Sequence, residues 1–123
     1  MAVPILKQSK YLIATIQSAL SDTDLVLLRD ALAEQVGKFR SRGVIVDVTA
    51  LDVLDSFASR TLRDMAYVVG LRGALMVIVG IQPEVAFAMV QLGITLSTVA
   101  TALDLEEGLA YLDGRLRHAQ RGA

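Results

Sequence analysis

Two short, almost uninterrupted runs of apolar residues constrain the fold more than any other feature of this sequence. Val44–Val48 and Ala74–Val79 are rich in β-branched residues and contain a single charge, at Asp47. Runs in which successive side chains are apolar are typical of strands buried on both faces, as in parallel sheets covered by helices. The sequence therefore predicts a central, largely parallel sheet with helices packed on it.

Segments with helical periodicity alternate with these two runs. A first helix is expected to begin after Ser21, which is a suitable N-cap, and Asp22 and Asp24 suit the positive end of its dipole. Its apolar residues recur at spacings of three and four, so they share one face that packs on the sheet. These residues are Leu25, Leu28, Leu32, Val36 and Phe39.

Two further helices are expected in the middle of the chain. One covers Ser56–Val69 and is expected to stop at Gly70. The other begins at Pro83, which suits the first helical position, and runs to Leu92, with Gly93 as its C-terminal cap. The residues expected on or near the inner side of the first of these helices are Phe57, Thr61, Met65 and Val69.

The remaining strands are short. Val3–Leu6 and Tyr11–Ile16 are β-prone and are separated by the polar stretch Lys7–Lys10, which predicts a hairpin. A weak strand is expected at Thr98–Ala100. The order of elements is then β-β-α-β-α-β-α-β-α, which favours an α/β domain with a mostly parallel sheet and an antiparallel N-terminal strand.

The last helix closes this pattern. Thr101 and Asp104 are expected to form a capping box at its start. Its apolar residues are Leu105, Leu109, Leu112 and Leu116. We therefore expect one domain over residues 1–123, with about four helices, a core from about residue 3 to 116 and a tail over residues 117–123.

Composition excludes several classes of protein. Apolar residues make up 54% of the 123 residues and charged residues 20%, which excludes a disordered chain. The net charge of −1 argues against a nucleic-acid-binding protein, and the absence of cysteine excludes disulfides and thiol chemistry. The longest apolar stretch, Gly73–Ile81, is far shorter than a membrane-spanning helix, and the N-terminal residues do not resemble a secretory signal. A soluble, cytoplasmic protein is expected.

Polar residues gather in the stretch from Asp47 to Ser59, between a buried strand and a helix start. In open α/β sheets, sites lie where strand carboxyl ends meet helix N-termini. Asp52 and Asp55 are spaced as an acid–base or metal-binding pair, but no second cluster of oxygen ligands accompanies them, and no metal is expected. The simpler interpretation is that Asp55 or Ser56 caps the helix.

Enzymatic chemistry finds little support. The only histidine, His118, lies in the C-terminal segment and is expected to be solvated rather than catalytic. Neither of the common glycine-rich nucleotide-binding motifs is present, so no cofactor is expected. A phosphoaspartyl receiver domain is a poor match, because the acidic pair after the first strand and the lysine near the last strand are missing. A small α/β enzyme that uses Asp52, Asp55 and Ser56 remains the alternative from a different class.

Two loop motifs resemble those of a known family. Asp55-Ser56, after a strand that ends in Asp47-Val48-Thr49, is similar to the phosphorylation loop of STAS domains, the fold of anti-sigma-factor antagonists. Gly80-Ile81-Gln82-Pro83, followed by an alanine-rich helix that closes in Leu92-Gly93-Ile94, strengthens the likeness. Freely diffusing antagonists usually carry Ser/Thr-Gly after the motif serine, whereas Phe57-Ala58 stands here. The chain therefore most resembles the family's small stressosome scaffold proteins, and no sensor domain is expected before Val3.

The resemblance implies a non-enzymatic scaffold of stress-response signalling. Such a protein co-assembles with sensor-bearing STAS paralogues, associates with itself and sequesters a serine/threonine switch kinase, and a dedicated phosphatase resets it. By the same resemblance, Ser56 is the phosphoacceptor, Ser59 a weaker candidate, and Asp52, Asp55 and Phe57 belong to the kinase-recognition loop. The alternative within the family is a freely diffusing anti-sigma-factor antagonist that is controlled by serine phosphorylation.

Overall fold

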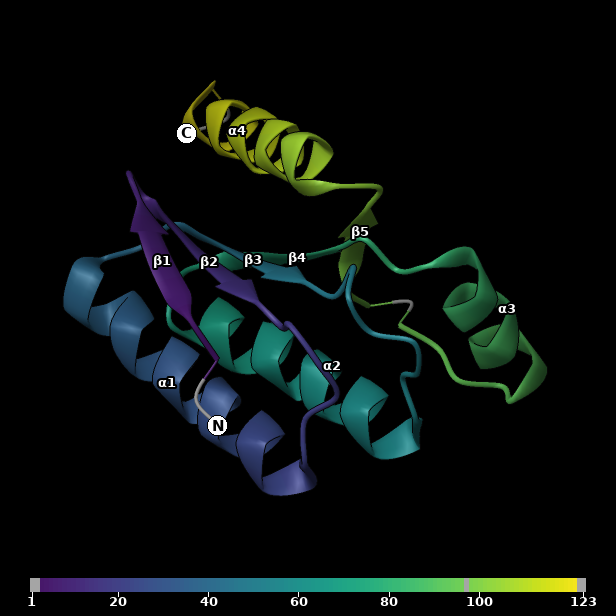
Figure 1. The fold of residues 1–123 in the computed structure, drawn as a ribbon. Helices are drawn as coiled ribbons and strands as arrows, with labels where there is room; N and C mark the ends of the chain where they lie inside the picture. Colours follow the sequence, from purple (N-terminus) through teal and green to yellow (C-terminus); the bar gives the residue numbers. More distant parts are fainter. Residues whose placement is uncertain (1–2, 97, 122–123) are drawn as a thin grey trace.

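A mixed β-sheet forms the centre of the molecule. The computed structural model describes residues 3–96 and 98–121, and within them five strands form one sheet in the order β1-β2-β3-β4-β5 (Figure 1). The strands are β1 (Ile5–Gln8), β2 (Tyr11–Thr15), β3 (Gly43–Asp47), β4 (Leu75–Val79) and β5 (Ala100–Ala102). Only the β1–β2 pair is antiparallel, and the other three pairs are parallel. The predicted fold class is confirmed.

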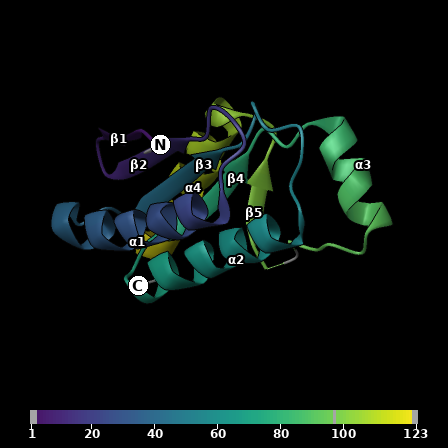
Figure 2. The same cartoon turned by 60° about the horizontal axis from the view of Figure 1, so that its bottom comes forward.

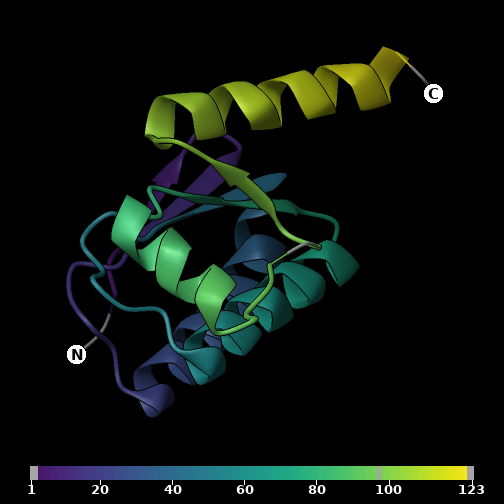
Figure 3. The ribbon, with the colours of Figure 1, turned by 90° about the vertical axis from the view of Figure 1, so that its right-hand side faces the viewer.

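Helices cover both faces of this sheet. The helices of the described residues are α1 (Asp22–Phe39), α2 (Ser56–Leu71), α3 (Pro83–Gln91) and α4 (Leu105–Arg121). α1 and α2 lie side by side on one face, and α4 lies across the other face (Figures 1 and 2). α3 lies apart from both helical layers, beside the β5 side of the sheet (Figure 3).

The two-sided cover explains the apolar runs. Alternate residues of the central strands, such as Val44, Val46 and Ile78, are buried with α1 and α2 in the larger core. The residues between them, such as Ile45 and Val77, are buried in a second core under α4. Because both sides of each pleat are buried, almost every position of these strands has to be apolar. Leu112 and Leu116 supply the α4 side of the second core, as their spacing predicts.

The hairpin is tighter than predicted. β1 begins at Ile5 rather than Val3, and Gln8 pairs with Tyr11, so that only Ser9 and Lys10 form the turn. Ser9 has a φ of +56°, the left-handed conformation typical of two-residue hairpin turns. Lys7 and Gln8, predicted as loop residues, lie in the ladder instead. An edge strand accepts polar side chains because they face solvent.

The end of α2 and the burial of Phe39 also differ from the predictions. α2 continues through Gly70 to Leu71, because the chain reverses at Gly73, which has a φ of +94°. Phe39 occupies the last turn of α1 and remains 37% exposed, with the ammonium groups of Lys38 and Lys7 5.2 and 5.9 Å from its ring centre. The end of the apolar stripe therefore passes beyond the core.

The entry into α4 is shifted as well. β5 covers Ala100–Ala102 rather than Thr98–Ala100, and Thr101 pairs with Ile78 inside this strand. The cap of α4 is Asp104, whose carboxylate accepts a hydrogen bond from the Glu107 amide at 2.9 Å. The Glu107 carboxylate accepts one from the Leu103 amide at 3.3 Å. The predicted capping box of Thr101 and Asp104 is thus wrong, because the cap lies one turn later in the chain. At the other end of α4, residues 117–121, which were expected as a tail, continue the helix.

Candidate functional site

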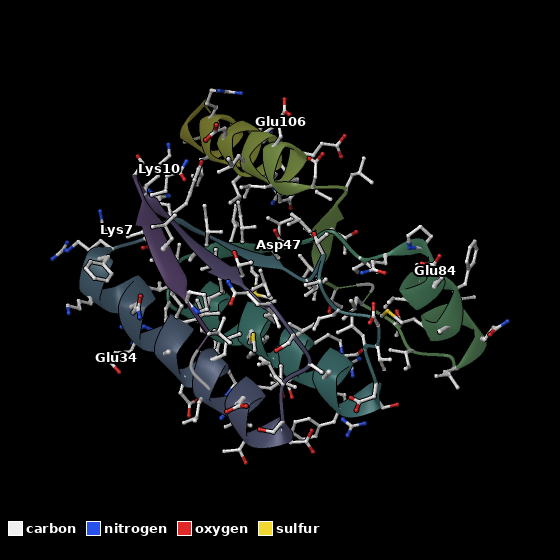
Figure 4. All side chains as sticks on the ribbon, viewed as in Figure 1. Lys7, Lys10, Glu34, Asp47, Glu84 and Glu106 are labelled. Carbon is white, nitrogen blue, oxygen red and sulfur yellow. The ribbon has the colours of Figure 1, made fainter. Side chains whose placement is uncertain are left out.

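The candidate site lies at the carboxyl ends of β3 and β4. Figure 4 shows Asp47 at this end of β3, while Lys7 and Lys10 lie at the hairpin, at the opposite end of the sheet. The Asp47 carboxylate accepts hydrogen bonds from the amide of Thr49 at 2.9 Å and from its hydroxyl at 2.6 Å. These bonds hold the first turn of the β3–α2 loop directly after the buried strand.

The loop after β4 is tied to this turn. The side-chain amide of Gln82 donates a hydrogen bond of 2.6 Å to the Thr49 carbonyl. Gly80 lies directly against Thr49, and a Cβ on Gly80 would come within 1.9 Å of the Thr49 hydroxyl oxygen. Gly80 also has a φ of +84°, which disfavours any other residue. The two motifs that carried the family resemblance are therefore in contact with each other.

Asp55 is the N-cap of α2. Its side chain accepts a hydrogen bond from the amide of Ala58 at 2.8 Å, and its carbonyl accepts one from the amide of Ser59 at 2.9 Å. The sequence left open whether Asp55 or Ser56 caps this helix, and the structure assigns the cap to Asp55. Ser56 is the first helical residue and is exposed. Its hydroxyl is not used for capping.

The remaining predicted site residues divide into two groups. Asp52 is exposed in the same loop as Asp55 and Ser56. Phe57 is half-buried against the larger core. Ser59 is only 1% exposed, and its hydroxyl has no hydrogen-bond partner within the described residues. The structure thus places Asp52, Asp55 and Ser56 together on the surface and turns Ser59 inward.

Two cavities flank the start of α2. The first has a volume of about 110 Å³, lies between α1 and the β3–α2 loop, and includes Asp55 in a mainly apolar lining. The second has a volume of about 190 Å³ and lies on the α3 side. Its lining consists of Ser56, Ser59, Arg60 and Arg63 from α2 and Leu92, Gly93, Ile94 and Thr95 from the loop after α3.

Sequence reasoning missed the two arginines of the second cavity. Arg60 and Arg63 follow Ser56 by four and seven residues, a spacing that places all three on one helical face. This spacing was available in the sequence, but the contribution of the loop after α3 was not. Only the folded chain brings residues 92–95 next to the start of α2.

Other kinds of site find no support among the described residues. No group of three or more histidine, cysteine, aspartate or glutamate side chains in this part of the chain is arranged to hold a metal ion. His118 is exposed on α4, across the sheet from α2. Among the helices that the structure describes, none is long and apolar enough to cross a membrane.

Comparisons with known proteins agree with the resemblance that the motifs indicated. A sequence model of the STAS domain family matches residues 2–108. Over 82 residues the chain is 35% identical to the RsbT co-antagonist protein RsbRA of Bacillus subtilis (strain 168). This match covers 67% of the chain but only 30% of RsbRA, so the chain spans less than a third of that protein.

Two solved structures are similar over nearly their whole length. A serine-to-glutamate variant of RsbS from Moorella thermoacetica has a TM-score of 0.79 and 32% identity, and the match covers 94% of this chain and 97% of that one. A chain from the molecular architecture of the stressosome, a signal integration and transduction hub, has a TM-score of 0.74 and 31% identity. That match covers 93% of this chain and 99% of the other.

Proposed function

This chain belongs to the STAS domain family, and on that premise we propose that it is a non-enzymatic stressosome scaffold switched by phosphorylation of Ser56. The similarity to RsbS and to a stressosome chain supports the scaffold role. RsbRA is named as a co-antagonist of RsbT, which supports a partner of that type, a serine/threonine switch kinase. The observation that carries the proposal is the exposed Ser56 hydroxyl at the start of α2.

Accessibility separates the two candidate serines. A kinase has to reach the hydroxyl from solvent, and Ser56 is exposed whereas Ser59 is 1% exposed. Phosphorylation of Ser59 would require the first turn of α2 to open, with loss of the bonds that Asp55 makes to Ala58 and Ser59. Ser56 is therefore the proposed phosphoacceptor, and Asp52 and Asp55 belong to the recognition loop around it.

Charge explains how the kinase is released. A phosphoryl group adds about −1.5 to −2 charges at neutral pH, next to the exposed carboxylates of Asp52 and Asp55. A kinase surface that fits the neutral hydroxyl then faces a bulky anion that it has to desolvate. A change of about 1.4 kcal/mol in binding free energy alters the affinity tenfold. In this proposal a dedicated phosphatase of the RsbX type restores the hydroxyl and with it the kinase-binding form.

Assembly with other STAS proteins completes the proposed role. The identity to RsbRA supports co-assembly with sensor-bearing paralogues of the RsbR type. α3 carries apolar side chains that no other part of the described chain covers. Phe87, Val90 and the adjoining Leu92 are 70%, 77% and 72% exposed. Exposed apolar groups of this kind mark interaction surfaces, which supports burial of α3 in an assembly or in self-association.

The switch is tested by incubating the chain with the cognate RsbT-type kinase and Mg·ATP, followed by intact-mass and tandem mass spectrometry. We expect one phosphate, on Ser56. Ser56→Ala should abolish it, and Ser59→Ala, the matched control, should retain it. Phosphate on Ser59, or no phosphate at all, would contradict the assignment.

Kinase affinity gives the second readout. Ser56→Ala should bind the kinase as tightly as the unmodified protein, because it keeps a neutral, compact side chain. Ser56→Asp and the phosphorylated form should bind at least about tenfold more weakly. Equal affinities for all four forms would refute the release mechanism.

In sedimentation with an RsbR-type paralogue, the scaffold should enter a large complex, whereas a freely diffusing anti-sigma-factor antagonist would stay small.

A further inference from the structure

The face of α2 that begins at Ser56 is basic. Arg60 and Arg63 follow Ser56 by one and two helical turns, and all three residues line the 190 Å³ cavity described above. We infer that this cavity is an oxyanion site that receives the phosphoryl group carried by Ser56. The inference rests on the proposed phosphorylation of Ser56 and adds where the phosphate lies once it is attached.

The cavity has the size and the walls for such a group. Its volume of about 190 Å³ far exceeds the roughly 10–15 Å³ that a cavity needs in order to hold one water molecule. α2 forms one wall, and Leu92, Gly93 and Ile94 form part of the wall opposite. Because Ser56 itself lines the cavity, a phosphoryl group on its hydroxyl starts at the edge of the site rather than in open solvent.

A buried donor without a partner lies in the same cavity. Ser59 lines it, is 1% exposed, and its hydroxyl makes no hydrogen bond within the described residues. Buried hydroxyl groups are almost always hydrogen-bonded, so an unpartnered one can still donate to an acceptor that enters the cavity. A phosphoryl oxygen in the cavity would supply that acceptor. Ser59 is thus assigned as a ligand of the phosphate rather than as a second phosphoacceptor.

The charges of the two arginines are available to bind the phosphoryl group. Neither Arg60 nor Arg63 forms an ion pair with any residue that the structure describes. Guanidinium groups bind phosphoryl oxygens through paired, charge-assisted hydrogen bonds. The start of α2 adds further donors. Asp55 accepts hydrogen bonds from the amides of Ala58 and Ser59, and the amides of Ser56 and Phe57, in the first turn of the helix, remain available to an anion.

The carboxylate nearest in sequence is directed elsewhere. Asp55 precedes Ser56, but it lines the cavity on the α1 side and is absent from the lining of the basic cavity. Its side chain accepts the hydrogen bond from the Ala58 amide at 2.8 Å. The phosphate and the Asp55 carboxylate are therefore drawn to opposite sides of the helix start, which reduces their repulsion.

The site changes what phosphorylation does to the surface. Before modification, the partner meets a hydroxyl next to two uncompensated arginines. After modification, the phosphoryl group neutralises both arginines in place. An aspartate at position 56 carries one charge instead of about two and has a shorter reach, so it reproduces only part of this change.

The test uses the full chain with phosphoserine placed at position 56 during translation, so that no kinase is involved. Phosphorus NMR over a pH series measures the second pKa of the phosphate in the folded protein and in the same protein unfolded in urea. We expect the folded value to be lower by about one unit, because neighbouring cations favour the dianion. Arg60→Gln with Arg63→Gln should remove most of this difference, and Arg72→Gln, which removes an exposed arginine beyond the other end of α2, should not.

Several outcomes would overturn the inference. A folded pKa equal to the unfolded one, or a lowered pKa that does not change when both arginines are lost, excludes the site. Ser59→Ala should also change the phosphorus chemical shift, and an unchanged shift would exclude Ser59 as a ligand.

Titration of the unmodified chain with inorganic phosphate distinguishes a free anion from the tethered group. Saturable binding of inorganic phosphate, without any pKa change in the phosphoserine form, would overturn the assignment in favour of a free-anion site. Failure of a kinase to modify Ser56 would refute the proposed function but would leave this measurement unaffected.

Discussion

Gly80 shows how a single residue holds the candidate site together. It combines a φ of +84° with an approach to Thr49 that leaves no space for a side chain, and Gln82, two residues later, bonds the Thr49 carbonyl. The loop that follows β4 thereby supports the loop that leads to Ser56. Asp55 contributes from the loop between β3 and α2. Because Asp55 caps α2, the Ser56 hydroxyl is not used as the cap and is free for modification.

Gly80→Ala should therefore cost more than backbone strain alone. A left-handed conformation costs a non-glycine residue about 1–2 kcal/mol, and the collision with Thr49 adds to it, so we expect a loss of about 2 kcal/mol or more. Gly93→Ala is the matched control, since Gly93 has a φ of +70° but nothing within 4 Å of its missing Cβ. Urea unfolding of both variants measures the difference, and equal losses would show that the contact with Thr49 is unimportant.

At the scale of the element, helix ends depend on capping more than on apolar periodicity. The periodic positions Leu25, Leu28, Leu32 and Val36 are all buried as predicted, yet the C-terminal end of α2 and the start of α4 are displaced from their predicted positions. A stripe of apolar residues indicates which face packs on the sheet. It does not indicate which polar residue takes the cap, since Thr101 and Asp104 are both acceptable cap residues.

Asp104→Ala tests the cap that the structure assigns to α4. The variant loses the acceptor for the Glu107 amide, and we expect the free energy of unfolding to fall by about 1 kcal/mol. Thr101→Ala, at an exposed position in the short strand β5, should cost less than half as much. Thermal and urea unfolding compare the two. A larger loss for Thr101→Ala would restore the capping box that the sequence predicted.

At the scale of the whole molecule, α4 covers the second face of the sheet and closes the second core. Tyr11 of β2 contributes to this contact, because its hydroxyl donates a hydrogen bond to the Asp113 carboxylate across 102 positions of the chain. Burial, and then the hydrogen bond and charge of Asp113, raise the pKa of Tyr11 far above its ordinary value of 10.0. The neutral phenol is therefore the form that the folded protein retains.

This shift predicts a loss of stability at alkaline pH. Above a pH of about 10, tyrosine ionises in the unfolded chain but not at position 11 of the folded one, so the free energy of unfolding falls by up to about 1.4 kcal/mol per pH unit. Below that pH, the contribution is fully present. Urea unfolding across this range should show a flatter dependence for Tyr11→Phe than for the unmodified chain. Tyr67→Phe, at a position 69% exposed, should keep the original slope.

The sequence alone determined the order of elements, the two-sided burial of β3 and β4 and the loop that holds the candidate site. These depend on local properties of the sequence, namely β-branched apolar runs, helical periodicity and suitable cap residues at the start of each periodic segment. The same local patterns predicted Ser21 as the N-cap of α1, which the structure confirms. They also predicted that α3 runs to Leu92 with Gly93 as its cap, but the helix ends at Gln91 and Leu92 is the C-cap, so this end is wrong by one residue. The assignment of Ser56 as the phosphoacceptor comes from the family resemblance and stays a prediction.

The tertiary structure decided what each site residue faces. It buried Ser59, directed Asp55 and Ser56 to different cavities, and brought residues 92–95 against Arg60 and Arg63. No local pattern contains this information, because it depends on where the loop after α3 returns to the start of α2. Segments more than thirty residues apart meet there only because parallel strands place their carboxyl ends at the same edge of the sheet.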